Sequence, residues 1–506
     1  MRNAHSVAAV REAESALMAN VPEGALMQRA AAGLASVCIG LLPAVYGSRV
    51  VVLAGSGDNG GDALYAGARL AARGAVVTAV AAAARVHEAG AAALRDAGGR
   101  LIEAGPGADP AGPAGRTAAD RAIAAADLVI DGLLGIGGHG GLRQPAASLA
   151  AAAERAPGPV VAVDLPSGID ADTGEVAGAA VTADVTVTFG TLKPGLLIDP
   201  GASHAGVVEF VDIGLGGYLG RPAVAAAQAA DIADWLPRPT AESDKYRRGV
   251  LGIVAGSDRF TGAATLAVGG AIRGGAGMVR LVSTEIPVGL VRQRWPEAVI
   301  TTTHAGEEGG AAIEQAGRVQ AWTAGPGMGT GDASLSLLAA VLATDLPVLV
   351  DADGITLLAE HRELLPRSAP TLLTPHAGEL SRLLGGVDRA DIEARRLHFA
   401  TQAAAELGCT VLLKGSTTVI ASPEPGREVL VNPTGTSWLA TAGSGDVLSG
   451  LAGSLLAQGL DPARAAAAAA YLHGIAARLA ADGAPIGSED IITALPAAIR
   501  TVENRA

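Results

Sequence analysis

The chain has only two cysteines, Cys38 and Cys409, far apart in apolar stretches of its 506 residues. This scarcity excludes a disulfide framework and indicates two buried, reduced thiols in a cytoplasmic protein. We do not expect either thiol to be catalytic.

Positive charge is also scarce, since the chain has 37 Lys and Arg compared with 50 Asp and Glu, and its net charge is -13. The chain therefore lacks the broad basic surface that nucleic acid or anionic lipid would favour, and any phosphate must be bound locally. No uncharged apolar run reaches the ~18 residues that span a bilayer. The first residues also lack the apolar core of a signal peptide. We expect no nucleic-acid or membrane partner.

The chain is too long to fold around a single hydrophobic core, which predicts two domains. Short apolar β-branched runs alternate with helical stretches in both halves, a pattern typical of α/β folds with doubly wound parallel sheets. We expect two three-layer αβα domains, over 1–220 and 225–506, joined by a linker at Gly216–Ala230. Apolar spacing over Val7–Leu42 predicts two helices separated at Pro22.

A glycine-rich segment, GSGDNGGD, follows the apolar strand Arg49–Ala54 and precedes a helical stretch. A strand, a glycine loop and a helix N-terminus together favour a nucleotide or phosphate site. Alternatively, the segment is a tight turn whose Asp and Asn cap the helix. Asp131, Asp164 and Lys193 also follow apolar runs, so we expect them at the same edge of the sheet.

A second glycine segment, AGSGD, opens the helix that contains Asp446. Its backbone N–H groups can cradle an anion, and the carboxylate beside them is suited to take a proton from an attacking hydroxyl. The alternative is an Asp that only stabilises the helix dipole. His376 in TPHAGE and the segment KGSTT lie at other strand ends. The alternative for His376 is a buried structural histidine, and the alternative for KGSTT is an ordinary strand-to-turn segment.

Residues 1 to about 215 resemble the epimerase domain of NAD(P)H-hydrate repair enzymes, in the motifs GSGDNGGD, DGLLGIG, VDLPSG and TFGTLKPG. The resemblance implies a Rossmann-like fold, proton handling by Asp164 and Lys193, and a potassium ion held by Asn59, Asp131 and Ser167. Asp58 and Ala63 stand where the family usually has Asn and Gly. The residues implied to contact the hydrated dinucleotide are Asp58, Asn59, Gly60, Gly61, Asp62, Gly135, Ile136, Gly137, Gly138, His139, Gly140, Gly141 and Asp164.

Residues 231 to 500 look like the ADP- or ATP-dependent NAD(P)H-hydrate dehydratase, a member of the ribokinase-like superfamily, in AGPGMGTGD, TPHAGE, KGSTT and AGSGD. The resemblance implies magnesium with ADP, and Asp446 as the catalytic base. It places Ala263, Gly327, His376 and Asp446 at the hydrated nicotinamide. The residues implied to contact ADP are Lys414, Gly415, Ser416, Thr417, Thr418 and Gly445.

The resemblance implies repair of the hydrated cofactors NADHX and NADPHX. The N-terminal domain would interconvert the R and S epimers. The C-terminal domain would dehydrate the S form with ADP, giving AMP and phosphate. Two alternatives stay open: a ribokinase-like small-alcohol kinase, and a non-catalytic N-terminal binding domain. We also expect a homo-oligomer.

Overall fold

The computed structural model describes residues 1–104, 117–304 and 306–504. This part of the chain forms two compact units: Asn3–Val224, and Ala225–Ala506 together with Met1–Arg2. Among the described residues, no helix combines the length and apolar character needed to cross a bilayer.

The N-terminal unit contains a seven-stranded sheet of order β4-β3-β2-β5-β6-β7-β8, in which the described neighbours pair in parallel. The chain begins with β1 (Arg2–Ala4), which belongs to the sheet of the C-terminal unit. The elements of the N-terminal unit are α1 (Val7–Met18), α2 (Ala25–Leu41), β2 (Arg49–Ala54), α3 (Asp58–Ala71), β3 (Val76–Ala81), α4 (Glu88–Asp96), β4 (Arg100–Glu103), α5 (Ala118–Ala124), β5 (Leu128–Gly132), α6 (Ala146–Ala153), β6 (Val160–Val163), β7 (Val185–Phe189), η1 (Pro194–Leu196), α7 (Gly201–Ala205) and β8 (Val207–Val211).

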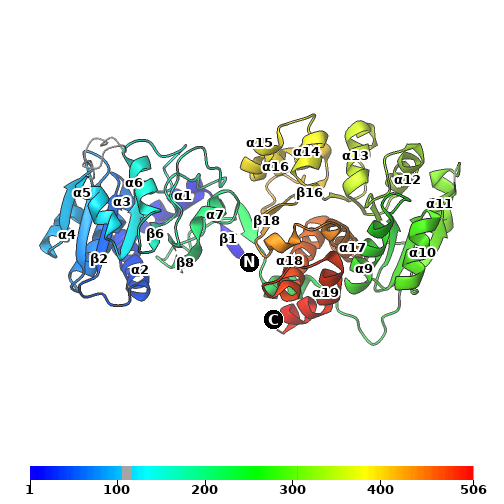
Figure 1. Ribbon diagram of the computed structural model, residues 1–506, viewed down its shortest axis with the longest axis horizontal. Coiled ribbons are helices and arrows are strands. Elements are labelled where there is room, and N and C mark those ends of the chain that lie inside the picture. Colours follow the sequence, from blue (N-terminus) through cyan, green and yellow to red (C-terminus); the bar gives the residue numbers. More distant parts are fainter. Residues whose placement is uncertain (105–116, 305, 505–506) are drawn as a thin grey trace. The chain divides into compact units, whose positions relative to one another are not determined.

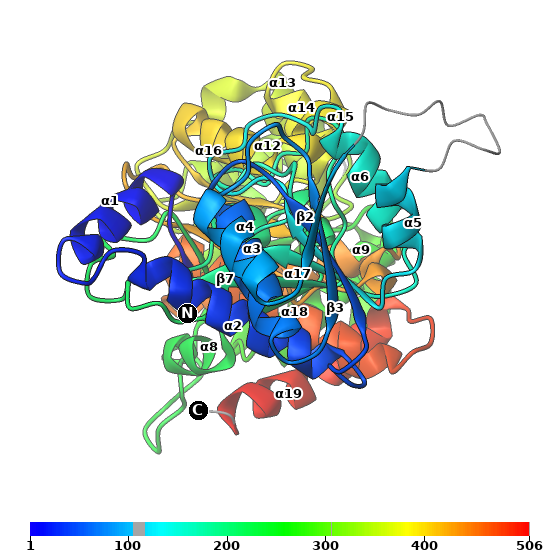
Figure 2. The ribbon, with the colours of Figure 1, turned by 90° about the vertical axis from the view of Figure 1, so that its left-hand side faces the viewer.

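Both faces of this sheet are covered, because side chains along each strand point alternately to opposite faces. Val50 and Val52 of β2 join a core with α2 and α3. Val51 and Leu53 of the same strand join a second core with α5 and α6. Figure 2 shows β2 and β3 standing between α3 and α4 on one side and α5 and α6 on the other. The unit is therefore a three-layer αβα domain.

The C-terminal unit is built on an eleven-stranded sheet of order β1-β9-β18-β17-β16-β15-β14-β13-β10-β11-β12. All neighbouring strands between β16 and β12 in this order pair in parallel. Strand β17 is antiparallel to both of its neighbours, β16 and β18. Its elements are β9 (Val224–Ala226), α8 (Ala229–Trp235), β10 (Val250–Val254), α9 (Thr261–Arg273), β11 (Met278–Ser283), α10 (Glu285–Arg294), β12 (Val299–Thr302), α11 (Gly309–Ala316), β13 (Ala321–Ala324), α12 (Asp332–Leu342), β14 (Val348–Val350), α13 (Ala352–Glu360), η2 (Arg362–Leu364), β15 (Thr371–Leu373), α14 (Ala377–Leu383), α15 (Arg389–Ala394), α16 (Arg396–Leu407), β16 (Thr410–Leu413), β17 (Thr418–Ala421), β18 (Val429–Asn432), η3 (Ser437–Leu439), α17 (Ser444–Ala457), α18 (Pro462–Ala481) and α19 (Ser488–Glu503).

One face of this sheet packs against α8, α9, α17, α18 and α19 around a single alanine- and leucine-rich core. Figure 1 shows α17, α18 and α19 on one side of the unit and α13, α14 and α16 on the other. Helices α9 and α17 approach closely, since a methyl group at Gly450 would lie 1.9 Å from the carbonyl oxygen of Ala267. Only glycine allows the two helices to pack this closely at this position.

The predicted fold class and two local features are confirmed. Two helices flank Pro22, and both cysteines are buried and free. One expectation is wrong. Part of the predicted linker forms β9 and the start of α8, because Val224, Ala225 and Ala226 are fully buried and Ile232 enters the core. The segment KGSTT does follow the parallel strand β16, but the antiparallel strand β17 that comes next was not predicted.

The two units have separate apolar cores, which predicts that residues 225–506 fold alone. This fragment lacks the edge strand β1 and the first residue of β9, Val224. It also lacks the ion pair between the Met1 N-terminus and Asp231, which lies near the surface and contributes about 0–1 kcal/mol. We expect one cooperative thermal transition within about 4 °C of the matching transition of the full chain, measured by calorimetry. A fragment without a cooperative transition would show that its core needs the N-terminal unit.

Candidate functional sites at two sheet edges

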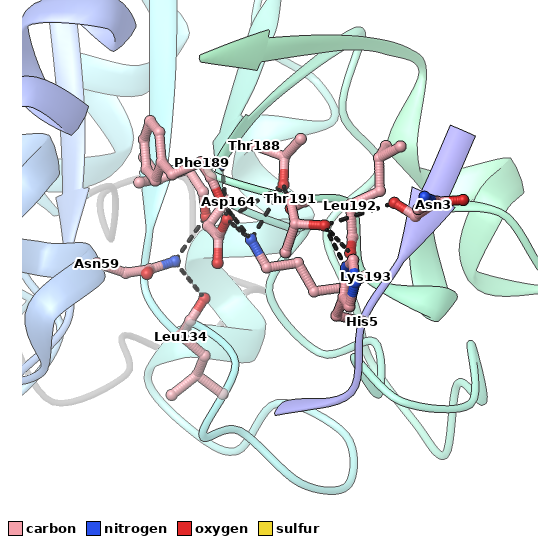
Figure 3. Close-up of polar contacts among 11 residues, drawn as sticks. Asn3, His5, Asn59, Leu134, Asp164, Thr188, Phe189, Thr191, Leu192 and Lys193 are labelled. Atoms are coloured by element: carbon pink, nitrogen blue, oxygen red, sulfur yellow. Dashed lines mark hydrogen bonds and ion pairs between the residues drawn. The ribbon is translucent and has the colours of Figure 1, made fainter. Parts of the chain in front are cut away.

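Asp164 and Lys193 form a buried ion pair at the carboxyl edge of the N-terminal sheet. Asp164 directly follows β6 with a backbone φ of 67°, and Lys193 follows the neighbouring strand β7. Asp164 Oδ1 also accepts hydrogen bonds from Thr188 Oγ1 (3.2 Å) and the Phe189 N–H (3.1 Å). Figure 3 shows the lysine side chain extended toward this carboxylate. The structure thus brings together the two residues predicted to handle protons.

Asp131 and Ser167 meet beside this pair. Ser167 donates to Asp131 through its hydroxyl (2.7 Å to Oδ1) and its backbone N–H (2.8 Å to Oδ2). Burial raises the pKa of Asp131 to about 6, although the hydrogen bonds from Ser167 oppose the rise. Asn59 Nδ2 donates to the carbonyl oxygens of Val163 (2.6 Å) and Leu134 (3.2 Å), and the Ser167 hydroxyl also reaches the Leu134 carbonyl (3.1 Å). Asn59 and Ser167 therefore share the Leu134 carbonyl, and Asp131 joins these predicted potassium ligands through its hydrogen bonds with Ser167.

The predicted loop Gly135–Gly141 passes over Asn59. A methyl group at Gly135 would lie 2.3 Å from Asn59 Oδ1, so a larger residue there would displace the Asn59 amide. His139 is 76% exposed, with Nδ1 3.4 Å from Asp170 Oδ2. A methyl group at Gly137 would lie 3.0 Å from Nη2 of Arg11, which belongs to α1. The remaining predicted loop residues are Ile136, Gly138, Gly140 and Gly141, and they lie between β5 and α6.

The segment Asp58–Asp62 forms the first turn of α3. Asp58 is exposed, whereas Gly60, Gly61 and Asp62 are buried. Asp62 Oδ1 has no hydrogen-bond partner among the described residues. Burial, and then the carboxylates of Asp164, Asp58 and Glu14, raise the pKa of Asp62 well above its usual range. Glu14 also has a raised pKa, chiefly because of burial. Asp62, which holds a proton more tightly than an ordinary carboxyl group, therefore lies close to the Asp164–Lys193 pair.

In the C-terminal unit, α17 begins without a side-chain cap, because Gly443 occupies the N-cap position with φ 85°. The N–H groups of its first turn can therefore bind an anion. Asp446 lies in this turn and is half-buried. Burial, followed by the charges of Asp351, Asp353 and Glu379, raises the pKa of Asp446 to about 7, and Lys414 opposes the rise. A carboxylate with this pKa is suited to general base catalysis near neutral pH.

Lys414 extends from the end of β16 to the start of α17. Its Nζ lies 2.7 Å from Asp351 Oδ1 and 3.7 Å from Glu379 Oε2. A methyl group at Gly445 would be 3.6 Å from Nζ. Burial disfavours the ammonium charge, but Asp351 and Glu379 outweigh burial and raise the pKa of Lys414. Gly415, Ser416 and Thr417 form the turn to Thr418 in β17. A charged lysine is thus held at the predicted phosphate cradle.

Ala263 and Gly327 meet at the start of α9. A methyl group at Gly327, where φ is 58°, would lie 2.7 Å from the Ala263 side chain. One turn further along α9, Leu266 lies so close to Gly443 that a methyl group there would be 2.4 Å from its Cδ1. Two of the residues predicted at the nicotinamide therefore adjoin the cradle.

His376 caps α14. Its Nδ1 accepts hydrogen bonds from the N–H groups of Gly378 (3.0 Å) and Glu379 (3.2 Å), so the neutral ring carries its proton on Nε2. Nε2 lies 3.4 Å from Glu379 Oε1. Burial lowers the pKa of His376, so the ring is neutral at pH 7. The side chain is still 55% exposed, and its contact with substrate stays a prediction.

Two family models match the chain. The one described as NAD(P)H-hydrate dehydratase matches residues 251–496, and the one described as YjeF-related protein N-terminus matches residues 23–195. The chain is 46% identical to the bifunctional NAD(P)H-hydrate repair enzyme of Mycobacterium leprae over 492 residues, which cover 96% of each chain. It is 48% identical to the enzyme of the same name from Mycobacterium tuberculosis, with 92% of each chain covered. The chain belongs to the family of bifunctional NAD(P)H-hydrate repair enzymes.

A solved structure, that of the ADP/ATP-dependent NAD(P)H-hydrate dehydratase from Bacillus subtilis co-crystallized with ATP/Mg2+, is 30% identical to this repair-enzyme chain. It covers 55% of this chain and 98% of its own, with a TM-score of 0.47.

The sequence interpretation missed several residues at both sites of this repair enzyme. Asp351, Glu379 and Ser449 surround Lys414, and Arg11 and Glu14 lie at the N-terminal site. One signal was available, because Asp351 follows an apolar run as Asp164 does. The position of α1 had no such signal, since its charged residues are typical of any exposed helix face.

Asp62 should make stability depend on pH. Its folded-state pKa exceeds the unfolded value of about 4, so the folded protein binds the proton more tightly and loses stability as pH rises above about 4. Asp62→Asn removes this titration. We therefore expect the Tm of the variant, relative to wild type, to be higher at pH 8 than at pH 5.

Asp58→Asn is the matched control, because it removes the same charge from an exposed position of the same turn. It should give a smaller change between the two pH values. A Tm difference for Asp62→Asn that is equal at pH 5 and pH 8 would contradict the account of Asp62.

Proposed function

We propose that this chain repairs hydrated NADH and NADPH in two steps. The N-terminal unit interconverts the R and S epimers, and the C-terminal unit uses ADP to dehydrate the S epimer, giving AMP and phosphate. The observation that carries the proposal is the position of Asp446, a carboxyl group with a pKa of about 7 in the uncapped first turn of α17, beside Lys414. A base, a cation and free N–H groups are what phosphoryl transfer to a hydroxyl requires.

In the dehydration step, the oxygen of the ring hydroxyl attacks the terminal phosphorus of ADP, and Asp446 takes the proton of that hydroxyl. The bond to the AMP oxygen breaks, and AMP leaves. The phosphorylated ring then loses phosphate from one carbon and a proton from the next, which restores the dihydronicotinamide. Lys414 and the first-turn N–H groups of α17 hold the phosphate charge throughout.

Magnesium suits this site as a partner of the nucleotide. No group of three or more His, Cys, Asp or Glu among the described residues could hold a metal ion, and the carboxylate of Asp351 is already bound to Lys414 and Ser449. The ion would therefore be held mainly by phosphate oxygens and water, as Mg²⁺ commonly is. When bound, it neutralises charge on the transferred phosphoryl group.

The epimerase reaction is assigned to Asp164 and Lys193. The buried pair supports a catalytic N-terminal unit over a binding module, because a binding module has no need to bury two charges at an open sheet edge. Asn59, Asp131 and Ser167 would hold potassium. Their donors are oxygens with one carboxylate among them, which fits a monovalent ion better than a divalent one. The buried free cysteines support a reducing compartment such as the cytoplasm.

Replacing Asp446 with Asn should remove the base and keep the shape of the turn. We expect the dehydration rate to fall by about 10²- to 10⁴-fold. The acid limb of the wild-type rate near pH 7 should disappear, because Asn does not titrate. ADP affinity by calorimetry should hold or rise, since a charge beside the phosphates is gone.

If Asp446 only stabilised the helix dipole, Asp446→Asn would lower stability by about 0.3–1 kcal/mol and leave turnover intact. Near-normal turnover with a lower Tm would thus assign the base to another residue. Epimer interconversion by the same variant is the internal control, and its rate should not change.

Potassium should be needed for epimerisation. We expect interconversion of the epimers, followed by chromatography without ADP, to slow when a large organic cation replaces potassium. Asp131→Asn should be slow in both salts, because it removes the carboxylate among the proposed ligands. Equal wild-type rates in both salts would refute the potassium site.

A further inference from the structure

Asp351 links the nucleotide-binding lysine to the helix that carries the base. It follows β14 and is buried, with only 1% of the residue exposed. One carboxylate oxygen, Oδ1, lies 2.7 Å from Lys414 Nζ. The other oxygen, Oδ2, accepts a hydrogen bond of 2.6 Å from the hydroxyl of Ser449. Asp351 occupies the N-cap position of α13, yet its side chain makes no capping hydrogen bond, so helix capping does not explain it.

Ser449 lies three residues after Asp446 on α17, so the two side chains share one face of that helix. The hydroxyl of Ser449 shows that this face points toward Asp351. Gly445 is equally close, since a methyl group there would lie 3.9 Å from Asp351 Oδ2 and 3.6 Å from Lys414 Nζ. Asp351 therefore lies directly beneath the first turn of α17.

The charges around Asp446 make this arrangement consequential. Asp351 at the N-cap of α13, Asp353 in α13, Glu379 in α14 and Lys414 after β16 all act on the pKa of Asp446. Four carboxylates repel a phosphate, so binding requires that the one lysine is held where it can neutralise the phosphate charge. Asp351 makes the shortest contact to that lysine, 2.7 Å compared with 3.7 Å for Glu379.

We propose that Asp351 is a positioning residue of the dehydratase: it holds Lys414 and the first turn of α17 as one unit, so that the phosphate bound by Lys414 lies within reach of Asp446. This inference rests on the proposed function. Asp351 touches neither the phosphate nor the ring in this scheme, and it acts through Lys414 and Ser449.

The test is a double-mutant cycle in the full-length protein with ADP, magnesium and the S epimer. Asp351→Asn should lower kcat by about 10- to 10²-fold, because the ammonium loses its anionic partner and a shift of ~1 Å has an effect of this size. If Asp351 acts through Lys414, adding Asp351→Asn to Lys414→Gln should lower kcat by less than about twofold further. Independent losses that multiply in the double variant would overturn the inference.

The pH profile separates positioning from a purely structural role. Loss of the negative charge of Asp351 should move the acid limb of kcat, set by Asp446, to lower pH. Ser449→Ala is the matched variant, because it removes the contact to α17 and keeps the charge. It should lower kcat by a few-fold and leave the acid limb in place.

An Asp351→Asn protein with a lower Tm but unchanged kcat and acid limb would show that Asp351 only stabilises the fold. If Asp351→Asn fails to fold, Ser449→Ala decides, and unchanged kcat in that variant refutes the link. Failure of the proposed function gives a different result, because the wild-type protein itself would then not dehydrate the S epimer. In that case the inference about Asp351 would also be refuted.

Discussion

A lysine ammonium buried against an aspartate at the carboxyl edge of a parallel sheet is the interaction on which both units depend. In the N-terminal unit, Lys193 and Asp164 follow the neighbouring strands β7 and β6. In the C-terminal unit, Lys414 and Asp351 follow β16 and β14, with β15 between them. Breaking such a buried pair by removing one partner costs about 3–5 kcal/mol, because it leaves a charge without compensation. The sheet therefore fixes the lysine position before any substrate binds.

The surroundings of these lysines raise the pKa values of several carboxyl groups. Burial raises the pKa values of Asp62, Asp131 and Asp446, and neighbouring carboxylates add to the rise for Asp62 and Asp446. Each unit thus places a carboxyl group that can exchange a proton near a fixed positive charge. Carboxyl groups with raised pKa values are suited to acid–base chemistry near neutral pH.

Much of both sites could be predicted from the sequence, because parallel strands bring their carboxyl ends to one edge. Strand ends and glycine loops were therefore enough to group Asp131, Asp164 and Lys193, and to select Asp446. The contacts of Asp351 could not be predicted, since they depend on which strands are neighbours and on which face of α17 carries Ser449. The antiparallel strand β17 and the short strand β9 were missed, because three or four apolar residues do not reveal strand direction or sheet membership.

The central claim, that one chain contains both activities, is tested most directly by how much cofactor is recovered from a mixture of the two epimers. Full-length protein is incubated with equal amounts of the R and S forms of hydrated NADH, ADP and magnesium, and the returning dihydronicotinamide absorbance is followed. The account predicts complete recovery with ADP and none without it. Recovery that stops at half would contradict the epimerase assignment, and no recovery would contradict the account as a whole.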